Sequence, residues 1–228
     1  MMSNKTVDCP IVTLDVAVDK GRIPSMPRAL FEGRIVVIQT KKEVAKAVSF
    51  LKSQEILGLD TETRPSFNKN ISYKVSLLQI STLEICFLFR LNYIGLPSDI
   101  ISLLSSDRNL KIGLSFKDDV HMLHQRADFE MGRMVELQKM ASDFGITDKS
   151  LQKLYANLFH QRISKTQRLS NWEAEVLSDA QKQYAATDAW ACVRIYNEFQ
   201  RLKHFHNYVL TSEKKHLEMI DKTIKDLL

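Results

Sequence analysis

The chain is poor in the residues that mark fibrous, disordered or disulfide-rich proteins: its 228 residues include seven glycines, five prolines and three cysteines. This scarcity, together with 44% hydrophobic residues, is typical of a globular protein and argues against a disordered or fibrous one. The cysteines are odd in number and widely spaced, so they predict neither a zinc site nor a disulfide framework. We expect Cys86 and Cys192 to be small core residues.

The sequence also lacks any run of the roughly 18 to 20 uncharged apolar residues that a membrane span needs. Its N-terminal segment, MMSNKTVDCPIVTLDVAVDKGR, lacks the unbroken apolar core of a signal peptide. We therefore expect no membrane partner and a cytoplasmic protein. The net charge of +5 is compatible with a polyanionic partner such as nucleic acid, although charge alone is weak evidence.

What the sequence does contain is a succession of strand and helix signals. β-Branched and apolar runs predict strands at 34–40, 56–63, 75–81, 84–90 and 110–116. Helical spacing predicts helices at 41–54, from Pro97 to about Leu104, at about 117–125, and through most of the chain that follows. Capping boxes open two of these helices, Thr40 with Glu43 and Ser178 with Gln181. Adjacent strands followed by strand–helix units predict a layered α/β domain with a mixed sheet.

Two end segments differ from this pattern. Residues 1–33 show no clear period and contain Pro10, Pro24 and Pro27, so we expect an irregular N-terminal arm that packs across the domain. The amphipathic segment within 204–228 predicts a C-terminal helical extension. No internal repeat or low-complexity segment interrupts the chain.

The first candidate for chemistry is a pair of carboxylates at the end of an apolar strand. Strand periodicity places Asp60 and Glu62 on one face, with Cα atoms roughly 6.5 Å apart. Two like charges at a core boundary push one pKa upward unless a cation bridges them, so a hard divalent ion is a natural occupant. The alternative is that both carboxylates simply extend into solvent, which is the commoner outcome for an isolated Asp-x-Glu pattern.

The second candidate lies in GLSFKDDVHML, where Asp118 and Asp119 fall in the first turn of a helix after a buried strand. The positive end of the helix dipole favours a carboxylate there, and that stabilisation by itself is a sufficient explanation. His121 and His124 follow without a third nitrogen or sulfur ligand nearby, so we interpret them as surface or packing residues rather than zinc ligands.

The third candidate is the helical segment QYAATDAWACVRIY. Tyr184 and Asp188 are four residues apart and therefore share one face, among small apolar residues. A carboxylate in such surroundings is costly to bury without a partner, and a bound cation would supply one. The alanines would let this helix approach the sheet closely enough for Asp188 to reach Asp60. The alternative is an Asp188 that reaches solvent from a packed helix, with Tyr184 as an ordinary core residue.

Taken together, the three candidates resemble the three exonuclease motifs of the DEDD superfamily. The tyrosine four residues before Asp188 is similar to that of the DEDDy branch, whereas Gln183 stands where the histidine branch has its histidine. The closest similarity is to the Werner exonuclease and ribonuclease D group, through the segments LGLDTET, VSLLQIS, IGLSFKDD and SNWEAEVLSDAQKQYAATDAW. The resemblance covers about residues 34–203, which would form the 3′–5′ exonuclease domain.

The resemblance implies a ribonuclease H-like fold and a metal-dependent enzyme that releases nucleoside 5′-monophosphates from 3′ ends. It implies a site for two Mg²⁺ or Mn²⁺ ions on Asp60, Glu62, Asp119 and Asp188. Aligning Gly113 and Leu123 with the family pattern points to Asp119 rather than Asp118, which remains the fallback. Tyr184 would position the attacking water.

Substrate contacts are expected in a basic loop upstream of the third motif. Lys165 and Arg168 lie near Trp172 in the sequence, a combination that suits a single-stranded backbone with base stacking. The alternative is a solvated loop with Trp172 in the core. The resemblance also places three residues at positions that line the terminal nucleotide pocket: Thr61, Thr63 and Gln79.

The motifs do not choose between DNA and RNA. The SNW and YAATDA segments are more similar to Werner-type domains, which favours DNA slightly, and a ribonuclease D-like enzyme acting on RNA is the alternative. A non-catalytic nucleic-acid-binding module is disfavoured because all four acidic residues are present.

Overall fold

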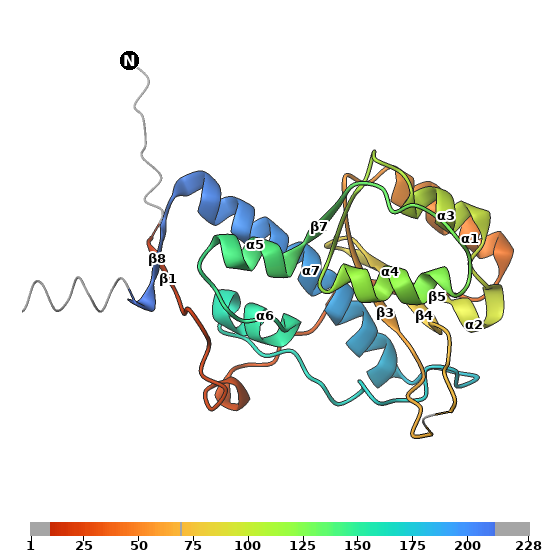
Figure 1. The fold of residues 1–228 in the computed structure, drawn as a ribbon, viewed down its shortest axis with the longest axis horizontal. Helices are drawn as coiled ribbons and strands as arrows, with labels where there is room; N and C mark the ends of the chain where they lie inside the picture. The colour runs from red at the N-terminus through yellow and green to blue at the C-terminus, as the bar shows by residue number, and fades with distance from the viewer. Residues whose placement is uncertain (1–9, 69, 213–228) are drawn as a thin grey trace, which may run out of the picture.

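The computed structural model describes residues 10–68 and 70–212 (Figure 1). Its strands are β1 (Val12–Leu14), β2 (Arg34–Ile38), β3 (Ile56–Glu62), β4 (Leu77–Ser81), β5 (Ile85–Arg90), β6 (Leu110–Gly113), β7 (Met134–Glu136) and β8 (Tyr208–Leu210). Its helices are η1 (Ile23–Ser25), α1 (Lys41–Lys52), α2 (Leu91–Ile94), α3 (Ser98–Leu104), α4 (Phe116–His124), α5 (Leu137–Asp143), α6 (Leu151–Phe159) and α7 (Asp179–Phe205). None of the helices in these two ranges is long and apolar enough to span a bilayer.

Six strands form the central sheet, in the order β2-β5-β4-β3-β6-β7. Strand β4 is antiparallel to both of its neighbours, and the other pairings are parallel. The mixed sheet that the sequence predicts is therefore confirmed, as is the hairpin of β4 and β5. Strand β3, which carries Asp60 and Glu62, lies inside the sheet between β4 and β6, so its backbone is fixed by hydrogen bonds on both sides.

Helices cover both faces of this sheet. One face packs on α1, α3 and α4 through a core that includes Val44, Leu51 and Leu103. The other packs on α5, α6 and α7 through a core that includes Leu154 and Ile195. Helix α7 is the longest of the described helices and crosses β3, β4, β5 and β6, and Figure 1 shows α5 and α6 beside it. The cysteines Cys86 and Cys192 are buried in the second core, as expected.

The two helices that the sequence predicts from capping boxes begin where expected. Thr40 accepts a hydrogen bond from the Glu43 backbone, and the Glu43 carboxylate accepts one from the Thr40 backbone, so α1 begins at Lys41. Ser178 and Gln181 make the same reciprocal pair at the start of α7. Both boxes satisfy backbone donors that have no partner inside the helix.

Two local expectations are wrong. Strand β6 stops at Gly113 rather than continuing to 116, because Ser115 adopts a left-handed conformation with φ of 64° and turns the chain directly into α4. The region after about residue 130 is not wholly helical, because Met134–Glu136 forms β7 at the edge of the sheet. A three-residue strand is too short to show periodicity, so its pairing with β6 decides its structure.

The end segments also differ from expectation. The described part of the arm, residues 10–33, contributes Leu14, Ala29 and Phe31 to a hydrophobic core, and it is not wholly irregular, since it contains β1 and the short turn η1. Beyond α7 the chain forms β8, which pairs in parallel with β1, so residues 208–210 are not part of a helical extension. Residues 213–228, where most of that helix is expected, lie outside the described residues.

Helix α7 approaches β3 so closely that only glycine fits at position 58. A Cβ atom at Gly58 would lie 2.0 Å from the Ala189 carbonyl oxygen, which belongs to backbone and has no side chain to rotate away. The Cys192 thiol contacts the Leu59 carbonyl oxygen at 3.8 Å beside it. This close approach brings the acidic residue of α7 up to the carboxylates of β3.

Gly58→Ala is therefore expected to lower the free energy of unfolding by about 2 kcal/mol or more, because the helix and sheet backbones must separate. Urea denaturation would measure the change. Gly21→Ala is the matched control, since an added Cβ there meets nothing closer than the Asp19 carboxylate at 3.4 Å, and its effect is expected within about 0.5 kcal/mol. Equal stability of the two variants would contradict the close approach of α7 to β3.

Candidate metal centre and active site

The carboxylates predicted from the first and third motifs meet at one point. Asp60 and Glu62 project from the end of β3, and Asp188 projects from α7. Ligand oxygens of all three lie within 4.8 Å of one another. Asp188 is 4% exposed and Glu62 is 8% exposed, so the cluster is set into the protein rather than spread over its surface.

Burial and mutual repulsion keep these acids from ionising normally. Desolvation, followed by the charges of Asp119, Asp188 and Glu62, raises the pKa of Asp60 well above its ordinary value. Desolvation and the Asp188 charge raise the pKa of Glu62 to about 9, and desolvation raises the pKa of Asp188 to about 7. Concentrated, unneutralised negative charge of this kind is what a bound cation relieves.

Asp119 adjoins the cluster through Thr61. The Thr61 hydroxyl, which lies between the two acids of β3 in sequence, donates a hydrogen bond to the Asp119 carboxylate. Desolvation raises the pKa of Asp119 to about 6 although this hydrogen bond lowers it, and the charge of Asp119 in turn raises the pKa of Asp60. Asp118 is exposed. The geometry thus favours Asp119 over Asp118 as the acid of the second motif.

Glu136 orients the helix that carries Asp119, a role the sequence did not reveal. Its carboxylate accepts hydrogen bonds from the backbone amides of Ser115 and Phe116, at 3.1 and 2.9 Å, where α4 begins without a side-chain cap of its own. Glu136 belongs to β7, the strand missed by periodicity. Only the pairing of β7 with β6 brings it beside the start of α4.

Tyr184 lies one turn before Asp188 on α7, as predicted. Its ring packs against Trp172 with a centroid separation of 6.0 Å. Burial and the charges of Asp188 and Glu62 raise the pKa of the Tyr184 hydroxyl above its ordinary value, so this hydroxyl stays protonated. Hydrogen bonding by Tyr184 lowers the pKa of Asp188.

Trp172 is 0% exposed, which supports its interpretation as a core residue and leaves no indole surface for a base to stack on.

The loop that carries Trp172 is anchored by Arg90, at the end of β5. The Arg90 guanidinium donates hydrogen bonds to the backbone carbonyls of Ala174 and Glu175. The side chain of Arg90 is fully buried. The sequence offered no signal for this contact, because an arginine ending a strand is ordinarily exposed.

The residues expected to touch substrate fall into two groups. Lys165 and Arg168 are exposed on the loop before α7, and their charges lower the pKa values of Asp188 and Glu62 respectively, so both act on the acidic cluster electrostatically. Thr61 and Thr63 are partly exposed around it. Gln79 pairs opposite Asp60 across β3 and β4 but is 0% exposed, so it offers no open surface.

The residues present fit a divalent cation. All four acids supply the oxygen ligands that Mg²⁺ and Mn²⁺ prefer. One carboxylate oxygen of Asp188 is buried and has no hydrogen-bond partner among the described residues. A buried acceptor without a donor is costly, and a cation would satisfy it.

The chain is similar in sequence to known exonucleases. A family model described as 3′-5′ exonuclease matches residues 35–203. A 3′-5′ exonuclease of Arabidopsis thaliana is 30% identical over 197 residues, which cover 79% of this chain and 68% of that protein. The bifunctional 3′-5′ exonuclease/ATP-dependent helicase WRN of Mus musculus is 28% identical, over 78% of this chain but only 14% of its own length.

A solved structure of similar fold is that of Trypanosoma brucei ribonuclease D in complex with RNA U12. It matches with a TM-score of 0.64 and 20% identity, covering 74% of this chain and 63% of that one. At this identity the match establishes the fold, and the ribonuclease H-like architecture expected from the sequence is confirmed.

Proposed function

The chain belongs to the 3′-5′ exonuclease family, and we propose from this premise that it removes nucleotides from the 3′ end of single-stranded nucleic acid by a two-metal mechanism of the DEDDy type. The observation that carries the proposal is the meeting of Asp60, Glu62 and Asp188 within 4.8 Å, with Asp119 beside them. These four acids would hold the two divalent ions. When bound, such ions lower the pKa of a water and neutralise charge on the phosphate that is cleaved.

The chain's own residues contribute orientation. The Tyr184 hydroxyl stays protonated, because its pKa is raised, and it can hold a water by hydrogen bonding rather than act as a base. Lys165 and Arg168 carry positive charge beside the acids and would attract the backbone of the strand. Trp172 packs on the Tyr184 ring and so restricts its motion.

The proposal is tested by digesting 3′-labelled DNA and RNA oligonucleotides of matched sequence side by side. We expect nucleoside 5′-monophosphates to appear with Mn²⁺ or Mg²⁺ and not with a chelator, and DNA to be cleaved somewhat faster than RNA. Release of internal fragments, or no cleavage of either polymer, would contradict it.

A ribonuclease D-like activity on RNA is the second candidate. It is supported by the similarity in fold to the Trypanosoma brucei ribonuclease D that was solved with RNA. Faster cleavage of the RNA strand in the same experiment would favour it. The preference for DNA rests on the SNW and YAATDA segments alone.

Tyr184→Phe is expected to lower kcat by about 10- to 100-fold with little change in KM, since it removes a group that orients water without removing a cation ligand. Tyr196→Phe is the matched control on the same helix, where the hydroxyl accepts a hydrogen bond from Gln200. Steady-state kinetics on a labelled oligonucleotide would measure both. If the two variants have the same kcat, Tyr184 has no role in the mechanism.

A further inference from the structure

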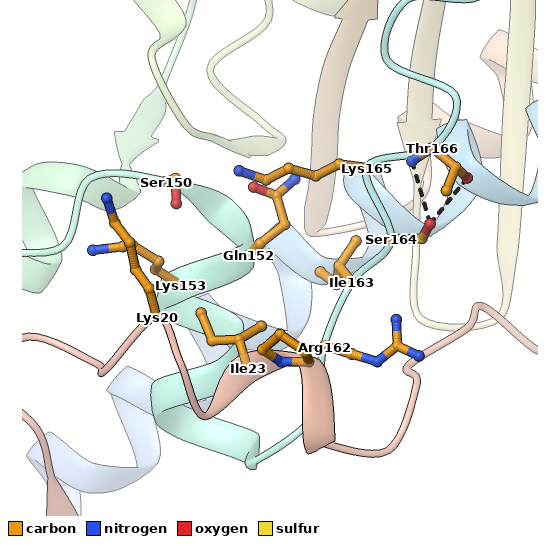
Figure 2. Close-up of a pocket in the computed structure, with 11 residues that line it drawn as sticks. Lys20, Ile23, Ser150, Gln152, Lys153, Arg162, Ile163, Ser164, Lys165 and Thr166 are labelled. Atoms are coloured by element: carbon orange, nitrogen blue, oxygen red, sulfur yellow. Dashed lines mark hydrogen bonds between the residues drawn. The ribbon is translucent and has the colours of Figure 1, made fainter.

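A cavity of about 600 Å³ lies between the N-terminal arm and α6, as Figure 2 shows. Its walls come from Lys20, Ile23 and Pro24 of the arm, from the first turn of α6, and from the loop at 162–166. The arm precedes the segment that matches the exonuclease family, which begins at residue 35. One wall of the cavity therefore lies outside the segment that matches the family model.

The charge of the cavity is entirely positive. The titratable side chains that line it are Lys20, Lys153, Arg162 and Lys165. In Figure 2 the side chain of Lys165 extends toward Gln152 and Ser150. Lys153 is paired with Asp148 at 2.6 Å, whereas Lys20 and Lys165 have no ion-pair partner among the described residues. Arg162 likewise has no ion-pair partner among the described residues, since its guanidinium donates to the neutral Met26 carbonyl, so Lys20, Arg162 and Lys165 carry the uncompensated charge.

The remaining walls combine apolar and polar surface. Ile23 and Pro24 provide accessible apolar surface, whereas Ile163 is 4% exposed and adds little. A nucleotide strand has the same two components, since its phosphates are anionic and the faces of its sugars and bases are apolar. Grooves that bind single strands pair cationic side chains with such surfaces.

The fold itself holds the cavity walls in place. The backbone amides of Asp15 and Val18 donate to the side chains of Asn157 and Asp148, at 2.9 and 2.8 Å. Both acceptors are nearly buried, at 2% and 3% exposed. The Arg162 guanidinium donates to the Met26 carbonyl at 3.0 Å and fastens the arm to the loop. The arm is thus fixed on both sides of the cavity.

Two contacts connect the cavity with the elements that carry the acidic cluster. Lys165 lines the cavity and also lies close enough to Asp188 to lower its pKa. On the side of α6, the Gln138 amide donates both to the Lys149 carbonyl at 2.8 Å and to the Ser115 hydroxyl at 3.0 Å. It thus joins the edge of the cavity to the start of the helix that carries Asp119.

We propose that this cavity binds the sugar–phosphate backbone of the substrate strand on the 5′ side of its terminal nucleotide, with Lys20 contacting a phosphate. The inference rests on the proposed function, because it requires the 3′ end of the strand to lie at the carboxylates. It adds the N-terminal arm to the substrate-binding surface. Lys20 then sets a preference for a continuing strand over a single nucleotide ester.

Lys20→Glu, made in the full chain, tests this role of the arm. The two substrates are a single-stranded 12-mer and the p-nitrophenyl ester of the matching nucleoside 5′-monophosphate, which carries no strand. We expect kcat/KM for the 12-mer, divided by that for the ester, to fall about fivefold to tenfold. Lys46→Glu is the matched control, since Lys46 is exposed on α1 over the opposite face of the sheet and should leave the ratio at the wild-type value. An unchanged ratio in Lys20→Glu would overturn the proposal.

Binding separates this inference from the proposed function. In an Asp60→Asn background, fluorescence anisotropy with a labelled 12-mer measures affinity without cleavage. Lys20→Glu should weaken binding and reduce the slope of log Kd against log salt by about 0.7, which corresponds to one lost phosphate contact on a single strand. If the wild type cleaves neither substrate while this change in slope appears, the proposed function is wrong but the cavity does bind the strand. If the slope of log Kd against log salt in Lys20→Glu equals that in Lys46→Glu, the cavity is not a substrate-binding site, whether or not the enzyme is active.

Discussion

Replacing Asp60 with Asn should reduce the rate of nucleotide release by about 10³-fold or more while leaving the fold intact. Asp60 is placed among Glu62, Asp119 and Asp188, so its amide analogue would deprive the proposed cations of a shared anionic ligand. Stabilisation of charge in the transition state by bound metal amounts to several kcal/mol, and each 1.36 kcal/mol changes the rate tenfold. Release of mononucleotides from a 3′-labelled strand at saturating Mn²⁺ measures the loss.

The matched control for this variant is Asp118→Asn, because Asp118 is exposed and is the neighbour of Asp119 in the sequence. It should retain activity within about threefold, since surface substitutions away from a site have small effects. Circular dichroism would verify that both variants fold. Near wild-type activity in Asp60→Asn would refute the two-metal mechanism, and a large loss in Asp118→Asn would return that residue to the ligand set in place of Asp119.

The second large effect is expected in the stability of the metal-free protein. The pKa values of Glu62, Asp188 and Asp119 are raised to about 9, about 7 and about 6, mainly by burial. Between about pH 4.5 and pH 9 the folded protein therefore binds more protons than the unfolded chain. Because the raised groups stabilise the fold only while protonated, their contribution is present at low pH and is lost as pH rises through these values, by about 1.4 kcal/mol per pH unit for each proton.

In urea denaturation with a chelator at pH 8, the wild type should accordingly show a lower free energy of unfolding than the Glu62→Gln variant. The difference between the two proteins should shrink toward pH 5. Adding Mn²⁺ at pH 8 should stabilise the wild type by about 2.7 kcal/mol when its concentration is a hundred times Kd. The variant serves as the control, because it cannot ionise at position 62. Equal pH profiles for the two proteins would show that the cluster is solvated and does not need a cation.

The reliability of sequence-based prediction differed from element to element. The capping boxes at Thr40 and Ser178 placed the starts of α1 and α7 correctly, because capping depends on residues only three apart. The sequence identifies the apolar runs of β3, β4 and β5 because most residues of each strand are buried. Strands β1, β7 and β8 were missed because each has three residues and exists through its pairing partner.

The acidic site shows the same division. Spacing in the sequence put Asp60 with Glu62 and Tyr184 with Asp188, because each pair lies within one strand or one helical turn. That the two pairs meet depends on the absence of a side chain at Gly58, where α7 comes up against β3. The choice of Asp119 over Asp118 depends on the direction of α4, which Glu136 and the left-handed Ser115 fix.

The sequence by itself determined the kinds of residue available: which carboxylates exist, which strand or helix carries them, and which family their order resembles. Only the tertiary structure decided that Trp172 is buried against Tyr184, that Arg90 anchors the loop between them, and that the N-terminal arm closes a basic cavity beside Lys165. The physical reason is the distance along the chain over which each effect acts. Propensity, periodicity and capping act over a few residues, whereas burial, charge repulsion and cavity shape arise between segments more than a hundred residues apart in the chain, such as the arm and α6.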